Sequence, residues 1–163
     1  GIVVGMVDTP AQAQQMVSWC KYPFIGERSS SGVHGEWGEF DNYRDYMDAV
    51  NEQLLILPMI ETLEALEAVD DIAAVDGVDV LLVGPSDLSI NLDVALDYRN
   101  DKNLAALEKI GRACQKAGNT AGMFFVPPGI KPAELEALGF RFFTLPWNEW
   151  AKAGIESGLN SLR

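Results

Sequence analysis

The feature that most constrains this chain is a regular alternation between short apolar runs and segments with helical periodicity. Five apolar runs recur along the 163 residues, and a helical segment follows each of them. Strands are expected at 2–6, 54–60, 78–83, 120–125 and 140–145. Strand–helix alternation predicts parallel pairing, and the nearly continuous apolar run at 54–60 is typical of a strand covered on both faces. The expected fold class is therefore α/β with a parallel sheet.

The helical segments carry recognisable start and stop signals. Thr9 and Pro10 form an N-cap followed by proline at the first helical position, and Gly118 with Asn119 ends a later helix. Helices are expected at 10–20, 41–52, 62–69 with a further turn to 75, 104–117, 131–138 and 147–159. Residues 21–38 form a long irregular loop and 91–100 a polar connection; long loops inside compact domains are more often functional than idle.

Two architectures use this order of elements. A five-stranded doubly wound sheet is complete at about this length, whereas an eightfold βα barrel needs roughly 250 residues and would lack three units here. Gly1 opens directly into a strand, although natural chains usually begin with a few loose residues. This start favours a piece cut from within a larger barrel protein.

The charge and the cysteine content limit which binding partners and which cellular compartment are expected for this chain. The chain carries 24 acidic and 12 basic residues, a net charge of −12, which argues against nucleic acid and anionic membrane as partners. No apolar run approaches the roughly 18 residues of a membrane helix. Cys20 and Cys114 match no metal or redox spacing, so both are expected to be buried thiols in a reducing, cytoplasmic setting.

Two acids stand where a parallel barrel places its chemistry. Glu61 follows the second apolar run and Asp87 follows the third. The carboxyl ends of neighbouring parallel strands share one mouth, and two carboxylates meeting there suit a hard divalent cation. Each acid also has a structural interpretation. Glu61 could gain about 0.3–1 kcal/mol from a helix dipole, and Asp87 could cap a helix or form a turn.

Four stretches of the sequence are familiar at this point. They are GIVVGMVDT at 1–9, KYPFIGER at 21–28, MIET at 59–62, and AVDGVD at 74–79 followed by VGPSDLS at 83–89. Together they resemble the HpcH/HpaI family of metal-dependent 2-oxo acid aldolases, whose fold is a (β/α) barrel of the phosphoenolpyruvate/pyruvate type. The resemblance implies that 1–163 is a single segment comprising the last five of eight βα units, with the three N-terminal units absent.

The resemblance also implies roles for individual residues. Glu61 and Asp87 match the two protein ligands of Mg²⁺ or Mn²⁺, with other divalent ions possible. Ser86 matches the residue whose backbone contacts the substrate carboxylate, and Gly84 and Pro85 shape the same loop.

Two departures from the family pattern stand out. Met59 occupies the position of a glutamine that commonly touches the 2-oxo acid, and its thioether offers no strong hydrogen bond. The family's catalytic histidine, with the acid and the arginine that support it, belongs to units upstream of Gly1. His34 does not match that position and is expected to be a surface loop residue. The base is therefore missing, and the isolated chain is expected to be inactive.

The implied function is an aldolase that cleaves a 4-hydroxy-2-oxo acid to pyruvate or a related 2-oxo acid plus an aldehyde. An acyl-CoA or citrate-type lyase of the same superfamily is a close alternative, but it would need a basic patch for CoA phosphates that this acidic chain lacks. A flavodoxin-like receiver or binding module is a different alternative. Asp8 and Asp87 partly fit it, although Leu145-Pro146-Trp147 lacks the expected lysine after the fifth strand. A third alternative is an inert fragment.

The remaining candidates have structural as well as functional interpretations. Arg28 could pair with substrate or a neighbouring subunit, or could clasp its own loop. An aromatic group is expected to serve the core and subunit contacts: Phe124, Phe125, Phe140, Phe142, Phe143, Trp147 and Trp150. In the resembled family the last helix packs between subunits, which implies a homo-oligomer. The open edge of the first strand would also invite pairing or aggregation in the isolated chain.

Overall fold

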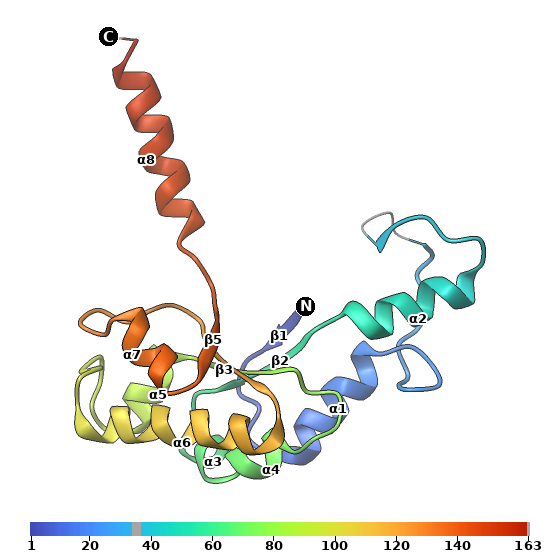
Figure 1. Ribbon diagram of the computed structural model, residues 1–163, viewed down its shortest axis with the longest axis horizontal. Coiled ribbons are helices and arrows are strands. Elements are labelled where there is room, and N and C mark those ends of the chain that lie inside the picture. The colour runs from blue at the N-terminus through green and yellow to red at the C-terminus, as the bar shows by residue number, and fades with distance from the viewer. Residues whose placement is uncertain (34–36, 163) are drawn as a thin grey trace.

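The computed structural model describes residues 1–33 and 37–162, and it alternates strands with helices (Figure 1). The strands are β1 (Ile2–Val4), β2 (Ile56–Ile60), β3 (Val80–Val83), β4 (Thr120–Met123) and β5 (Phe140–Phe143). The helices are α1 (Pro10–Cys20), α2 (Tyr43–Gln53), α3 (Leu63–Glu67), α4 (Val69–Ala73), α5 (Pro85–Asn91), α6 (Asp101–Ala117), α7 (Pro132–Ala137) and α8 (Trp147–Asn160). All five expected strands form, at slightly shorter lengths.

The order of the strands decides between the two architectures. The sheet runs β1-β2-β3-β4-β5 with every neighbouring pair parallel. A doubly wound sheet reverses its strand order at a switch point, whereas a barrel adds each strand beside the previous one. The fold is therefore a partial (β/α) barrel, and the flavodoxin-like alternative is wrong.

The two faces of the sheet have different partners, as in a barrel wall. Figure 1 shows α1, α3, α4 and α6 gathered along one side of the strands. Ile56, Ile60 and Leu81 belong to the large core on that side. Alternate strand residues form a separate small cluster on the other face: Leu57, Val80 and Leu82, with Met59 and Phe142 packed against them. Because side chains alternate along a strand, this second cluster lines the inner face.

The helix signals read from the sequence are present. Thr9 caps α1 through the Gln12 amide, the Gln12 side chain reaches back to the Thr9 amide, and Pro10 begins the helix. Gly118 ends α6 in the left-handed conformation, at φ +79°. These caps satisfy backbone groups that a helix end would otherwise leave unpaired.

The start of β2 differs from the expected one, and side chains form hydrogen bonds with backbone groups there. The expected strand at 54–60 begins only at Ile56, because the Leu54 carbonyl accepts a 2.6 Å hydrogen bond from Lys21 Nζ. The Ile56 amide in turn donates to Asp79 Oδ2 at 2.8 Å. Helix α5 was not expected as a separate element, and it occupies the turn between β3 and the polar connection.

Tyr22, just after α1, connects the start of the following loop to α2. The Tyr22 amide donates to Asn51 Oδ1 at 2.6 Å, and Asn51 Nδ2 donates back to the Tyr22 carbonyl at 3.1 Å. Tyr46 is fully buried and packs against the Tyr22 ring. Arg28 stacks over Tyr22 at 4.6 Å, which supports the local clasp interpretation of that residue. The expected position of His34 lies outside the described residues.

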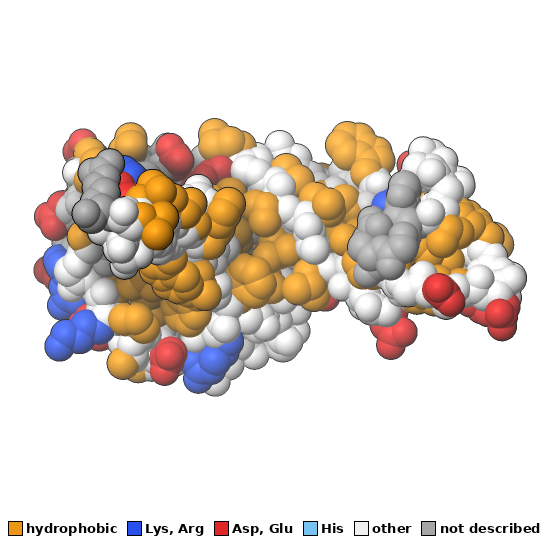
Figure 2. Space-filling model, turned by 90° about the horizontal axis from the view of Figure 1, so that it is seen from above, with side chains coloured by type: hydrophobic (Ala, Val, Ile, Leu, Met, Phe, Trp, Pro, Cys, Tyr) orange, Lys and Arg blue, Asp and Glu red, His pale blue; other side chains and the backbone are white. Residues whose placement is uncertain are grey.

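Apolar side chains remain exposed at both ends of the sheet. The β1 residues Ile2, Val3 and Val4 are 39–46% exposed, and Figure 2 shows apolar side chains gathered over the middle of the face seen from above. Helix α8 stands away from the body in Figure 1 and has no buried residue. The aromatic residues expected to serve the core and subunit contacts therefore differ in burial. Phe140 is buried and the other phenylalanines are less so, whereas Trp147 and Trp150 are 70% and 58% exposed.

Two smaller expectations are also resolved. Cys114 is buried as expected, but Cys20 is only half-buried because it ends α1 at the edge of the core; both thiols are free. Within the described ranges, no helix combines the length and apolar character needed to cross a membrane.

Candidate metal centre

Glu61 lies at the first position beyond β2 and is 6% exposed. Its Oε1 accepts a 2.7 Å hydrogen bond from the Met6 amide, just beyond β1. Met6 reaches this position with a left-handed backbone, at φ +56°. A buried carboxylate usually has a cation or several donors beside it, since an isolated buried charge is costly. Only one of the two Glu61 oxygens has a hydrogen-bond donor among the described residues.

Two glycines make room for this carboxylate. A Cβ built on Gly5 would lie 2.9 Å from Glu61 Oε1, and one built on Gly84 would overlap Glu61 Oε2. Neither glycine has a positive φ, so space and not backbone freedom is the constraint there. The chain therefore keeps side chains away from both oxygens of Glu61.

Asp87 lies in the first turn of α5 and is solvent-exposed. Strands β2 and β3 are neighbours, with Ile60 level with Val83, and the Gly84 amide donates to the Ile60 carbonyl at 3.3 Å. Glu61 and Asp87 thus leave the same end of two adjacent strands, as the sequence predicted. Their role as metal ligands stays a prediction.

Asn91 links the backbones of these two acids. Its Nδ2 lies 3.0 Å from the Glu61 carbonyl and 3.0 Å from the Asp87 carbonyl. Sequence reasoning missed this residue, because a side chain that bonds to a backbone carbonyl 30 positions earlier leaves no local signal.

A third carboxylate stands nearby on the β1 exit. Thr62 Oγ1 donates a hydrogen bond to Asp8 Oδ1 and accepts one from the Ala65 amide at 3.0 Å as the N-cap of α3. Asp8 therefore has a hydrogen-bonding role that the sequence did not reveal. In the described part of the chain, no group of three or more His, Cys, Asp or Glu side chains is arranged to hold a metal ion.

The donor set nevertheless fits a hard cation with open positions. Glu61 and Asp87 offer oxygen ligands of the kind that Mg²⁺ and Mn²⁺ prefer. Mg²⁺ sites typically use one or two carboxylates and fill the rest with water and substrate. The glycine-lined space around Glu61 is consistent with such a site.

The residues expected to contact substrate surround this mouth. Pro85 is buried, and Ser86 is half-buried with its Oγ 3.3 Å from Tyr98 Oη. The Ser86 carbonyl accepts from Ser89 Oγ at 2.7 Å, which ties the start of α5 together. Met59 is half-buried, and its Cε lies 3.1 Å from a Cβ built on Gly84. Met59 therefore places an apolar group beside Gly84, the glycine that also borders the Glu61 carboxylate.

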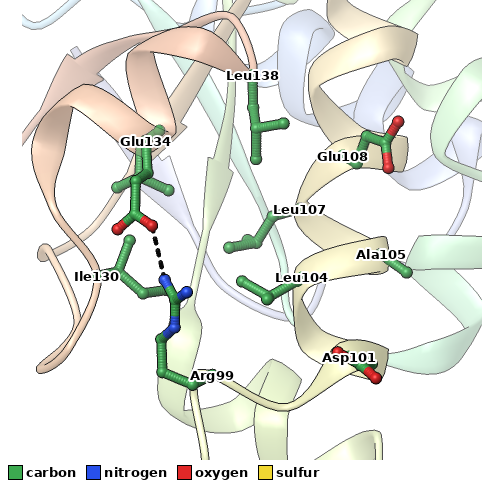
Figure 3. A pocket seen from close by; sticks show the side chains of 10 residues that line it. Arg99, Asp101, Leu104, Ala105, Leu107, Glu108, Ile130, Glu134 and Leu138 are labelled. Atoms are coloured by element: carbon green, nitrogen blue, oxygen red, sulfur yellow. Dashed lines mark hydrogen bonds and ion pairs between the residues drawn. The ribbon is translucent and has the colours of Figure 1, made fainter.

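A separate groove of about 410 Å³ lies between α6 and α7, and none of these residues lines it. Figure 3 shows Arg99 reaching across to Glu134, with Leu104, Leu107 and Ile130 nearby. Arg99 Nη1 lies 2.8 Å from Glu134 Oε1. The Lys131 amide and then Arg99 lower the pKa of Glu134, as expected for a carboxylate that accepts both bonds.

The family model described as HpcH/HpaI aldolase/citrate lyase matches residues 1–145. The chain belongs to this family. Among curated HpcH/HpaI relatives, the hydroxypyruvate/pyruvate aldolase of Roseobacter denitrificans is 35% identical over 141 residues, covering 86% of this chain and 55% of that protein. The 4-hydroxy-4-methyl-2-oxoglutarate aldolase of Hapsidospora irregularis is 36% identical over 125 residues, covering 76% and 46%. The chain thus spans about half the length of the curated relatives it matches.

Solved structures of the HpcH/HpaI family share the fold. The aldolase from Desulfitobacterium hafniense aligns with a TM-score of 0.79 at 25% identity, covering 95% of this chain and 62% of that one. A family protein from Burkholderia cenocepacia aligns with a TM-score of 0.78 at 27% identity, covering 99% and 64%. These neighbours agree with the partial barrel deduced from the strand order.

Proposed function

We propose that this chain forms the metal-binding part of a carbon–carbon lyase, an aldolase that cleaves a 4-hydroxy-2-oxo acid to pyruvate or a related 2-oxo acid plus an aldehyde. The observation that carries the proposal is the buried Glu61 carboxylate, which lies between Gly5 and Gly84 at the end of β2. The neighbouring strand β3 leads to Asp87. Relatives named as hydroxypyruvate/pyruvate and 4-hydroxy-4-methyl-2-oxoglutarate aldolases support this reaction class.

In this proposal Glu61 and Asp87 are the protein ligands of Mg²⁺ or Mn²⁺. When bound, the cation supplies Lewis-acid stabilisation of negative charge on a substrate oxygen. The turn formed by Gly84, Pro85 and Ser86 presents its backbone to the carboxylate of the 2-oxo acid. Met59 contributes apolar surface next to the ligands and no hydrogen bond.

We expect the 163-residue chain to bind the cation without turning over a substrate. No residue of this chain matches the position of the family's catalytic histidine, which serves as the base. Retro-aldol turnover by the purified chain would contradict this expectation.

Manganese titration followed by electron paramagnetic resonance tests the metal site. The variants are Glu61→Gln and Asp87→Asn, and the matched control is Glu136→Gln, an exposed glutamate on α7. Each ligand variant should weaken Mn²⁺ binding at least tenfold, since changes to groups that merely support a ligand already cost about 10–100-fold. The control should bind like the unaltered chain. Unchanged affinity in both ligand variants would refute the site.

We also infer that α8 packs against a second copy of the chain. Trp147, Trp150, Ile155 and Leu159 are each 55–70% exposed on this one helix. Clustered apolar exposure of this kind is typical of protein–protein contact. Analytical ultracentrifugation should show an oligomer that Ile155→Glu dissociates, whereas Ala153→Glu, on the opposite face of the same helix, should leave it assembled. A monomeric unaltered chain would contradict this inference.

A further inference from the structure

The side chain of Asn91 occupies a position that joins the two carboxylate-bearing segments. It is the last residue of α5, and its Nδ2 lies 3.0 Å from the Glu61 carbonyl and 3.0 Å from the Asp87 carbonyl. A primary amide nitrogen carries two hydrogens, so it can donate to both carbonyls at once. One side chain therefore makes contact with the backbone of both acids.

This link lies beyond the point where the sheet ladder ends. The β2–β3 pairing stops at Ile60 and Val83, followed by the hydrogen bond from the Gly84 amide to the Ile60 carbonyl. Glu61 continues toward α3, whereas Asp87 belongs to α5. The Asn91 amide fastens these diverging segments to each other at their backbones.

The chemistry of asparagine suits this place. Its amide is a neutral donor, so it satisfies two carbonyl acceptors without adding charge beside two carboxylates. Asn91 is also solvent-exposed, and its bond to the Asp87 carbonyl is exposed, so water can replace the amide there when the side chain is removed. Loss of this side chain should therefore change the spacing of the acids more than the stability of the fold.

We propose that Asn91 is a positioning residue that sets the separation of Glu61 and Asp87 for a shared divalent cation. This inference rests on the metal site of the proposed function. A metal needs its ligands at fixed distances, and loss of a group that orients a ligand typically weakens metal binding about 10–100-fold.

The experiment is Mn²⁺ titration of the full 163-residue chain and the variant Asn91→Ala, with a melting curve for each. The matched control is Asn119→Ala, because Asn119 Nδ2 also donates to a backbone carbonyl, that of Ala73 at 2.6 Å, away from the acids. We expect Asn91→Ala to raise the Mn²⁺ dissociation constant about tenfold. The control should leave it unchanged.

A double variant separates positioning from general loosening. With Asp87→Ala already present, position 87 offers no side-chain ligand, so the separation of Glu61 from it no longer matters. Adding Asn91→Ala should then weaken Mn²⁺ binding less than twofold, a non-additivity expected of residues that act together. Equal losses in both backgrounds would overturn the positioning role.

The remaining outcomes distinguish this inference from the proposed function. If both carboxylate variants weaken Mn²⁺ binding and Asn91→Ala does not, the Asn91 inference alone is wrong. An equal loss in Asn119→Ala would also reject it. If the unaltered chain binds no Mn²⁺, or the carboxylate variants bind like it, the metal site fails and the Asn91 role fails with it.

Discussion

Thr62 Oγ1 donates a hydrogen bond to the Asp8 carboxylate and so fastens the exit of β2 to the exit of β1. The same oxygen accepts the Ala65 amide at 3.0 Å and caps α3. Thr62 directly follows Glu61, whose Oε1 already accepts the Met6 amide. The β1 exit therefore restrains both the side chain of Glu61 and the residue after it.

The Thr62 contacts predict a difference between two substitutions. Thr62→Ala removes a helix cap and a buried hydrogen bond, so it should lower the free energy of unfolding by about 1–3 kcal/mol. Thr62→Ser keeps the hydroxyl and should retain most of that stability. Urea denaturation measures both. An equal cost in the two variants would show that the methyl group, not the hydroxyl, is responsible.

The space around Glu61 predicts the effect of a single methyl group. Gly84→Ala would force the new Cβ onto Glu61 Oε2, so the carboxylate must move. We expect Mn²⁺ binding to weaken about tenfold, as for other changes that reorient a ligand. Gly154→Ala in α8 is the control, because a Cβ there has nothing within 4 Å. The prediction is wrong if Gly84→Ala binds Mn²⁺ like the control.

The hydroxyl of Tyr46 is buried with no hydrogen-bond partner among the described residues. An unsatisfied buried polar group costs about 1–3 kcal/mol, so Tyr46→Phe should stabilise the chain by roughly 1 kcal/mol. Tyr43→Phe loses the 2.7 Å contact with Ser30 and should be neutral or slightly destabilising. Urea midpoints compare the two. Destabilisation by Tyr46→Phe would reveal a partner for that hydroxyl.

Burial raises the pKa of Cys114 from an ordinary 9.0 to about 11, and it also raises that of the half-buried Cys20. At pH 8 the folded chain should therefore react with iodoacetamide slowly at Cys20 and scarcely at Cys114, with both labelled in urea. Because the folded pKa of Cys114 is the higher one, its contribution to stability is complete below pH 9 and is lost as the pH rises toward 11. Mass spectrometry locates the label. Rapid native labelling of Cys114 would contradict its burial.

Met59 predicts how the site responds to a polar substitution. Met59→Gln adds an amide beside the proposed ligands, where it could donate to a 2-oxo acid. Pyruvate binding to the Mn²⁺-loaded chain, followed by water proton relaxation, should tighten about threefold to tenfold, the worth of one hydrogen bond. Met59→Leu should leave pyruvate affinity unchanged. Unchanged pyruvate affinity in the glutamine variant would contradict this prediction and place position 59 away from the substrate.

Sequence reasoning was most successful where a local signal is sufficient. The caps at Thr9 and Gly118 depend on side chains and backbone within one turn, and both are present. Strand ends were less accurate, because partners distant in sequence take their backbone groups, as Lys21 does at Leu54. The short helix α5 was missed because it begins at Pro85 and is only seven residues long, too brief for a periodic pattern.

By itself, the sequence determined the succession of strands and helices and the placement of Glu61 and Asp87 directly after two apolar runs. These properties follow from hydrophobic periodicity and order along the chain, which need no knowledge of contacts. Only the tertiary structure decided that the strands lie in sequential order, that Gly5 and Gly84 enclose the Glu61 carboxylate, and that Asn91 joins the two acids. The reason is physical: strand neighbours, steric clearance and side-chain hydrogen bonds exist only after segments far apart in sequence have been brought together by folding.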